Sequence, residues 1–176
     1  MVSAGEFNQM PDEAAAALLR GCCSSARWAE LVAGGRPYPD VAAVLDASDA
    51  AVGALDEADL REALAGHPRL GDKRAGADEK DGWSGSEQAG VGSADEASRA
   101  ALEAGNAEYE HRFGHIYLAC ATGRSAGDLA GFLRERLGNE PEREWLVVAN
   151  ELAKINRIRL GQLLGGAGQA GGGDAR

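Results

Sequence analysis

The stretch PEREWLVVANELAKINRIRLGQLL, residues 141–164, decides the fold that we predict for this chain. Its apolar residues step by three and four positions, the period of one helix face: Trp145, Val148, Leu152 and Ile155. Asn139, with Glu142 three residues on, precedes the stretch as a candidate N-cap. The sequence therefore predicts one long helix that packs this face into the core.

The next position of the same series is Arg159, and an arginine on a core-facing stripe is unusual. Burying a guanidinium is costly unless it meets an anion or several acceptors. One interpretation is that the side chain reaches the helix end or pairs with an internal carboxylate. The other is that its planar group grips the carboxylate of a bound ligand.

Nearly every other segment also carries a helical period and a recognisable cap. The expected helix starts are Pro11, Ser24-Ser25, Val41, Asp56 or Asp59, Ser93 and Ser125. Residues 1–9 resemble a short arm, and residues 115–121 are an apolar run that could form a buried strand or a buried helical turn. We predict an all-α fold: one domain over residues 1–164 with about eight or nine helices, and a disordered glycine-rich tail over 165–176.

The composition excludes several classes of protein. The 176 residues carry a formal net charge of −10, which argues against nucleic acid and anionic membrane surfaces as partners. No apolar run approaches the roughly 20 residues that a membrane-spanning helix needs. Cys22, Cys23 and Cys120 form a poor disulfide framework, so we expect buried thiols in a reduced, cytoplasmic protein.

A second stretch, GHPRLGDKRAGADEKDGWSGSEQAG over residues 66–90, is too polar and charged to lie in the core. A loop of this length between helical patterns is either a disordered insertion or the rim of a site. His67 lies in it between a glycine and a proline, and a loop imidazole suits general acid–base work. His111 and His115 lie near the end of a predicted helix, where we expect surface or packing roles.

The other end of this stretch, residues 84–88, resembles a helix start. Ser84 and Glu87 match an ordinary capping box. The alternative is a ligand site, because helix starts bind anions and polar carbonyls. An ionised Glu87 only accepts hydrogen bonds whereas Gln88 both donates and accepts, so the pair could recognise a ureido or amide group. The cysteines show no Cys-x-x-Cys spacing, and we expect no metal site.

Short motifs in a fixed order connect these regions. They are Cys22-Cys23-Ser24 with Trp28, Arg36-Pro37-Tyr38, His67-Pro68-Arg69-Leu70-Gly71, Ser86-Glu87-Gln88-Ala89-Gly90, Asn106 with Tyr109, Arg112-Phe113-Gly114, Gly123-Arg124, Arg136-Leu137, Lys154-Ile155 and Arg159-Leu160. Through them the chain, from about Phe7 to Leu164, resembles the 2-oxo-4-hydroxy-4-carboxy-5-ureidoimidazoline (OHCU) decarboxylases, the last enzymes of the route from urate to allantoin. Each motif alone is weak, whereas the ordered set is specific.

The resemblance implies an all-helical enzyme that needs no cofactor, is commonly a homodimer, and converts the ureidoimidazoline carboxylate to (S)-allantoin and carbon dioxide. It makes His67 the catalytic acid or base, Glu87 a second catalytic or orienting group, and Arg159 the group that holds the substrate carboxylate. The implied substrate site also contains Pro68, Ser84, Gly85, Ser86, Glu87, Gln88, Tyr117, Leu118, Ala119, Cys120 and Ala121.

A second hypothesis is a helical binding module for ureides or small carboxylates that keeps the pocket without turnover. Both hypotheses require His67, Glu87 and Arg159 to converge on one cavity. Only the enzyme accelerates loss of the substrate, so turnover separates them.

Overall fold

The computed structural model describes residues 1–71 and 96–165, which form eight α-helices and no strand. The helices are α1 (Ala4–Gln9), α2 (Asp12–Arg20), α3 (Ala26–Gly34), α4 (Val41–Gly53), α5 (Glu57–Ala65), α8 (Glu96–Phe113), α9 (Ala126–Arg136) and α10 (Pro141–Leu163). The prediction of an all-α fold is confirmed. The predicted cap Ser93 and the predicted tail beyond residue 165 lie outside the described residues.

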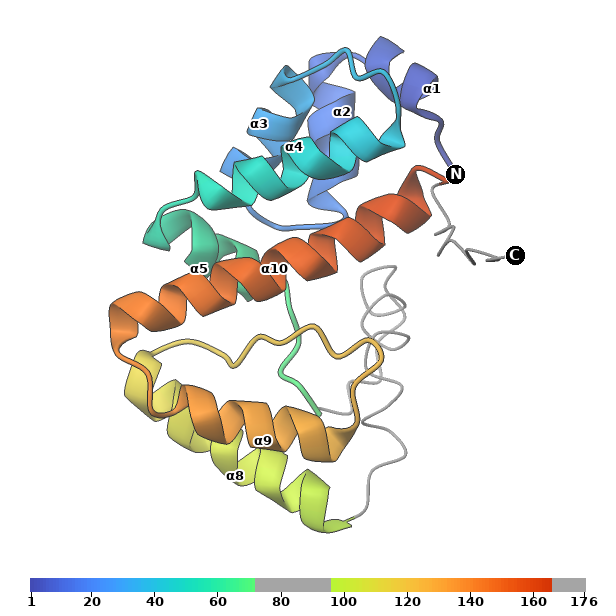
Figure 1. Ribbon diagram of the computed structural model, residues 1–176. Helices are drawn as coiled ribbons and strands as arrows, with labels where there is room; N and C mark the ends of the chain where they lie inside the picture. Colours follow the sequence, from blue (N-terminus) through green and yellow to red (C-terminus); the bar gives the residue numbers. More distant parts are fainter. Residues whose placement is uncertain (72–95, 166–176) are drawn as a thin grey trace, which may run out of the picture.

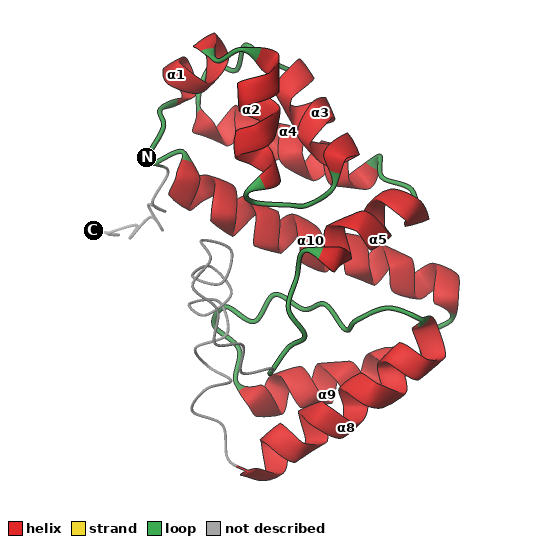
Figure 2. Ribbon diagram, turned by 180° about the vertical axis from the view of Figure 1, so that it is seen from behind, coloured by secondary structure: helices red, strands yellow, loops and turns green. Residues whose placement is uncertain are grey.

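The longest helix, α10, lies between two groups of helices (Figure 1). Helices α1 to α4 lie on one side, where α10 packs along α4, and the α8–α9 pair lies on the other. Helices α8 and α9 run in the same direction, because the segment that joins them crosses back over the length of the pair. That segment and the loop after α5 both lie between α10 and α9 (Figure 2).

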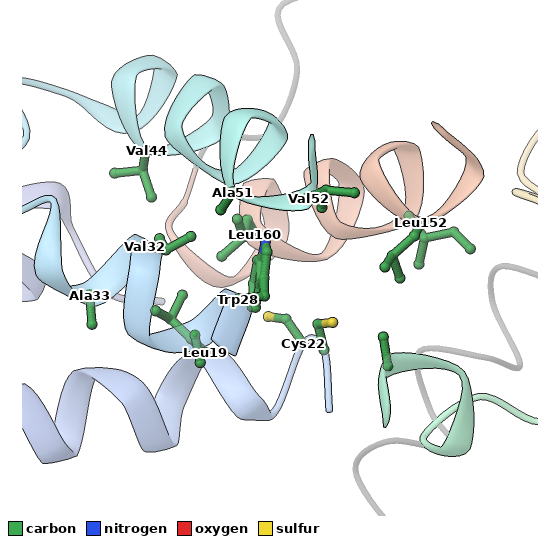
Figure 3. Close-up of a cluster of buried hydrophobic side chains, with 14 of the residues drawn as sticks. Leu19, Cys22, Trp28, Val32, Ala33, Val44, Ala51, Val52, Leu152 and Leu160 are labelled. Atoms are coloured by element: carbon green, nitrogen blue, oxygen red, sulfur yellow. The ribbon is translucent and has the colours of Figure 1, made fainter. Parts of the chain in front are cut away.

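Trp28 lies in the larger hydrophobic core (Figure 3). Ser25 caps α3 by accepting the Trp28 N–H at 3.2 Å, which fixes where this helix begins. The indole ring is fully buried, and its Nε1 lies 3.3 Å from both the carbonyl and the hydroxyl oxygen of Ser48 on α4. Leu160 of α10 lies beside the ring, so this tryptophan joins three helices.

The smaller core joins α8, α9 and the segment between them. Leu102 and Tyr109 of α8 pack in this cluster with Leu133 of α9. Gly105 lets the two helices approach closely, because a Cβ at this position would lie 2.5 Å from Leu133 Cδ2. Helices α8 and α9 thus pack against the segment that joins them, and residues of this segment line the pocket described next.

The prediction of a short arm over residues 1–9 is wrong. Ser3 and Glu6 form a capping box that starts α1, and Phe7 is fully buried. The Phe7 ring stacks on the Tyr38 ring, with 6.4 Å between the ring centroids. The Ser-x-x-Glu pattern that marks a helix start was present in the sequence, and a buried aromatic anchor stabilises a helix too short to form alone.

The expected cap at Asn139 is also wrong, because α10 begins after Glu140 and has no side-chain cap. The Asn139 amide instead donates to the carboxylate of Glu144 at 2.7 Å. The caps at Asp56 and Ser125 are confirmed as capping boxes. The Asn139 side chain thus binds the Glu144 carboxylate and does not cap the backbone N–H groups of α10.

All three thiols are buried, as expected, and none forms a disulfide. No helix in the described ranges is long and apolar enough to cross a membrane.

Candidate active site

A pocket that opens to solvent lies between the end of α5, α10 and the segment that crosses from α8 to α9. Its lining residues are His67, Pro68, Leu70, Tyr117, Leu118, Ala119, Cys120, Ala121, Thr122, Ile155 and Arg159. Of the thirteen residues predicted for the site, all eight that the structure describes line this one pocket. The other five, Ser84 to Gln88 with Glu87 among them, lie outside the described residues.

His67 is positioned by the end of α5. Gly66 packs so closely on Ser24 that a Cβ there would overlap the serine hydroxyl at 1.8 Å. The His67 N–H donates to the Leu64 carbonyl at 2.9 Å, and its ring Nδ1 lies 3.0 Å from the Ala63 carbonyl oxygen. A carbonyl oxygen only accepts, so Nδ1 carries a proton and Nε2 is the basic nitrogen of the neutral ring.

The far wall of the pocket is formed by residues 117–121, and the run 115–121 that contains it forms neither the strand nor the helical turn considered from sequence. It is an irregular buried segment. Two of its backbone groups bind charged side chains: Arg136 Nη1 donates to the Leu118 carbonyl at 2.6 Å, and the Cys120 N–H donates to Glu151 Oε2 at 2.8 Å. Buried backbone groups need partners, and here charged side chains replace a ladder or a helix.

Arg159 lies on the buried stripe of α10, as its spacing predicted, and is 6% exposed. Its guanidinium therefore does not extend to solvent at the helix end. Nη1 donates to the Cys22 carbonyl at 2.8 Å, and the side chain lines the pocket. The arginine thus places a cation in the pocket that His67 also lines.

A buried ionic network supports the wall and was not predicted from sequence. Glu144 of α10 is 0% exposed and Arg136 of α9 is 2% exposed, and the two pair at 2.5 Å. The Tyr109 hydroxyl donates to the same Glu144 carboxylate. Burial alone would lower the pKa of Arg136, but the hydrogen bond and charge of Glu144 outweigh it and raise that pKa. Arg136 therefore stays charged in this network.

His115 lies in a packing position, outside the pocket-lining set. Its ring centroid lies 4.2 Å from that of Trp145 and 5.4 Å from that of Tyr109. Burial is the main cause of a lowered pKa for this imidazole, and the Arg61 guanidinium acts in the same direction. The ring is thus held neutral by its apolar surroundings.

We expect His115 to make the free energy of unfolding fall between about pH 7 and pH 5. Its folded pKa lies below the unfolded value near 6.5, so the unfolded chain takes up the proton first as the pH decreases. The contribution is fully present above about pH 6.5 and is lost as the pH falls towards the folded pKa. Urea unfolding at both pH values should show a smaller loss for His115→Phe than for the wild type. Equal losses would contradict this assignment.

The part of the chain that the structure describes contains no group of three or more His, Cys, Asp or Glu side chains placed to hold a metal ion.

The fold and the pocket define an all-helical protein with a small, partly enclosed site whose polar groups include an imidazole, a guanidinium and backbone amides. The family model of OHCU decarboxylase matches residues 8–161, and the chain belongs to this family. The pocket residues described above all lie within the matched range.

Individual relatives agree with this assignment. The chain is 30% identical over 145 residues to the uric acid degradation bifunctional protein TTL of Arabidopsis thaliana, covering 81% of this chain and 45% of that protein. It is 35% identical over 77 residues to an OHCU decarboxylase of Amia calva, covering 44% of each. The aligned parts span less than half of these curated relatives.

A solved structure of OHCU decarboxylase in the presence of (S)-allantoin superposes with a TM-score of 0.72 at 22% identity, covering 89% of this chain and 99% of that one. A crystal structure of (S)-allantoin synthase matches with a TM-score of 0.68 at 19% identity, covering 93% of this chain and 54% of that one. At these identities the two structures establish the shared fold.

Proposed function

We propose that this protein is a decarboxylase that converts OHCU to (S)-allantoin and carbon dioxide in urate degradation, without a cofactor. The observation that carries the proposal is the convergence of His67, Arg159 and the wall 117–121 on one pocket. Family membership supports the same activity. The substrate combines a carboxylate, a ring hydroxyl and a ureido group, and the pocket offers a cation and an imidazole for the first two.

The reaction breaks the bond between a ring carbon and the carboxylate. The electron pair passes into the neighbouring carbon–nitrogen double bond of the imidazoline ring, whose nitrogen takes up a proton. The ring hydroxyl of the resulting enol then loses its proton to give the ring carbonyl of allantoin, and the adjacent ureido-bearing carbon takes up a proton. The protein must orient the carboxylate, stabilise the developing enolate charge and deliver the proton to one face. Arg159 supplies the orientation, and backbone N–H groups of the wall supply the stabilisation.

His67 is the proposed proton carrier. Its Nε2 either accepts the proton of the ring hydroxyl or, once protonated, gives a proton to the ring carbon. Glu87 is the proposed orienting or second catalytic group, and Ser84 to Gln88 the proposed ureido-binding run; these roles rest on the resemblance found in the sequence. A single face of protonation accounts for an optically active product.

The test is a coupled assay with freshly made substrate. Urate oxidase and hydroxyisourate hydrolase generate OHCU in the cuvette, and addition of this protein should accelerate its loss and yield optically active allantoin. Circular dichroism follows both quantities. Saturable binding of (S)-allantoin with no acceleration would instead favour the non-catalytic binding module.

Replacing Arg159 with lysine should raise the KM for OHCU by about tenfold or more, since a charge-assisted hydrogen bond contributes about 1.5–3 kcal/mol. Lysine keeps the charge but loses the planar, two-pronged geometry. Arg157→Lys is the matched control, because Arg157 lies two residues away and pairs with Asp46 and Asp49. A KM unchanged in Arg159→Lys would remove this residue from the substrate site.

We also propose a cytoplasmic homodimer. Buried thiols are typical of proteins in a reducing compartment, and the family resemblance implies a dimer. Leu146 of α10 is 68% exposed and is an apolar side chain that a second copy could cover. Light scattering of the purified protein measures the assembly: a mass of two chains agrees with the proposal, and a mass of one chain contradicts it.

A further inference from the structure

We propose that Glu151 is a positioning residue for the reaction: its carboxylate fixes the pocket wall, residues 117–121, so that the backbone N–H groups of the wall face the substrate. This inference rests on the proposed function. Glu151, Ile155 and Arg159 follow one another at four-residue steps and share one face of α10. One helix therefore supplies two pocket-lining residues and the anchor of the opposite wall.

The anchor is a buried carboxylate with a directional contact. Glu151 is 2% exposed, and its Oε2 accepts the Cys120 N–H at 2.8 Å. The same oxygen lies 3.3 Å from Arg124 Nη1, while Oε1 pairs with Lys154. The two cations balance the charge, and the N–H contact fixes the position of the wall because a charge-assisted hydrogen bond is short and strongly oriented.

The wall has a second anchor two residues earlier, where Arg136 holds the Leu118 carbonyl at 2.6 Å. Ala119 and Ala121 lie on either side of the anchored Cys120, and both line the pocket. Within the described residues neither of their N–H groups donates to a backbone carbonyl. Two donors held in this way suit the oxygen of an enolate or a carboxylate.

Three variants test this role in the full-length protein. Glu151→Met removes the acceptor while keeping a straight, helix-compatible side chain. Glu151→Gln keeps an acceptor oxygen but removes the charge. Glu142→Gln changes an exposed glutamate in the first turn of the same helix and serves as the matched control.

We expect Glu151→Met to lower kcat by about 10- to 100-fold while the KM stays within about threefold, because a displaced donor chiefly weakens interactions made in the transition state. Glu151→Gln should keep kcat within about threefold of the wild type, and Glu142→Gln should match the wild type. A kcat retained in Glu151→Met, or equal losses in both Glu151 variants, would overturn the proposal. If Glu151→Met does not fold, Glu151→Asp replaces it: the shorter side chain withdraws the acceptor, and an unchanged kcat would again overturn the role.

A second measurement does not depend on turnover. The amide proton of Cys120, hydrogen-bonded to a carboxylate, should give a downfield signal in ¹⁵N-edited spectra that moves upfield in Glu151→Met and stays in place in Glu142→Gln. A signal that does not move in Glu151→Met would overturn the anchoring. If the wild type shows no decarboxylation, the proposed function fails, and weaker (S)-allantoin binding in Glu151→Met would still support the positioning role while unchanged binding would contradict it.

Discussion

Replacing His67 with asparagine should lower the kcat for OHCU decarboxylation by about 10²–10⁴-fold, the usual contribution of a positioned proton carrier. The asparagine amide can still donate to the Ala63 carbonyl, as Nδ1 of the histidine does at 3.0 Å, so the loop should keep its conformation. What the variant lacks is the basic nitrogen Nε2. The free energy of unfolding should therefore stay close to that of the wild type.

The control is His111→Asn, which changes an exposed histidine at the end of α8. Circular dichroism of the product adds a second readout. A slow reaction that still gives optically pure (S)-allantoin would assign His67 to the hydroxyl proton, whereas racemic allantoin would assign it to protonation of the ring carbon. Full rate with full stereospecificity in His67→Asn would remove it from the mechanism.

Replacing Arg136 with methionine should lower the free energy of unfolding by about 3–5 kcal/mol, because it leaves the buried carboxylate of Glu144 without its cation. That is a large fraction of the 5–15 kcal/mol that stabilises a typical domain. It also frees the Leu118 carbonyl, which Arg136 holds at 2.6 Å. Urea unfolding monitored by tryptophan fluorescence measures the effect.

Arg134→Met provides the control for this variant, since Arg134 lies on the exposed face of the same helix and should change stability by less than about 0.5 kcal/mol. The double variant Arg136→Met with Glu144→Met should recover much of the loss, because removing both charges leaves no buried ion without a partner. A loss below about 1 kcal/mol in Arg136→Met would show that the pair does not hold α9 against α10.

Local patterns were sufficient to predict the stripe of α10 and the helices other than α1. Trp145, Val148, Leu152 and Ile155 were expected on one face, and the structure buries the last three fully or nearly so. The place of Arg159 on that face followed from the same period. Such predictions succeed because the spacing of side chains around a helix depends on residues three or four positions apart.

The irregular conformation of the wall, residues 117–121, could not be predicted from local patterns. Its backbone partners, Arg136 and Glu151, are 18 and 31 residues distant from the groups that they hold. No window of neighbouring residues contains that information. The sequence of residues 115–121, an apolar run without a period, therefore suggested a strand or a helical turn. Long-range contacts instead hold the run in an irregular conformation.

The buried acids of α10 did leave a signal in the sequence. Glu144 and Glu151 lie four residues before Val148 and Ile155, so both belong to the buried face of the helix. The same reasoning that singled out Arg159 applies to them. Their partners required the fold, because Tyr109 and Arg136 reach Glu144 from two other helices.

The most direct test of the proposed site is a crystal structure of this protein with (S)-allantoin bound. We expect the ligand in the pocket between α5, α10 and the wall, with polar contacts to His67, Arg159 and the N–H groups of Ala119 and Ala121. Glu87 should reach the same ligand. An allantoin molecule bound elsewhere, or His67 and Arg159 contacting separate surfaces in the complex, would contradict the proposed active site.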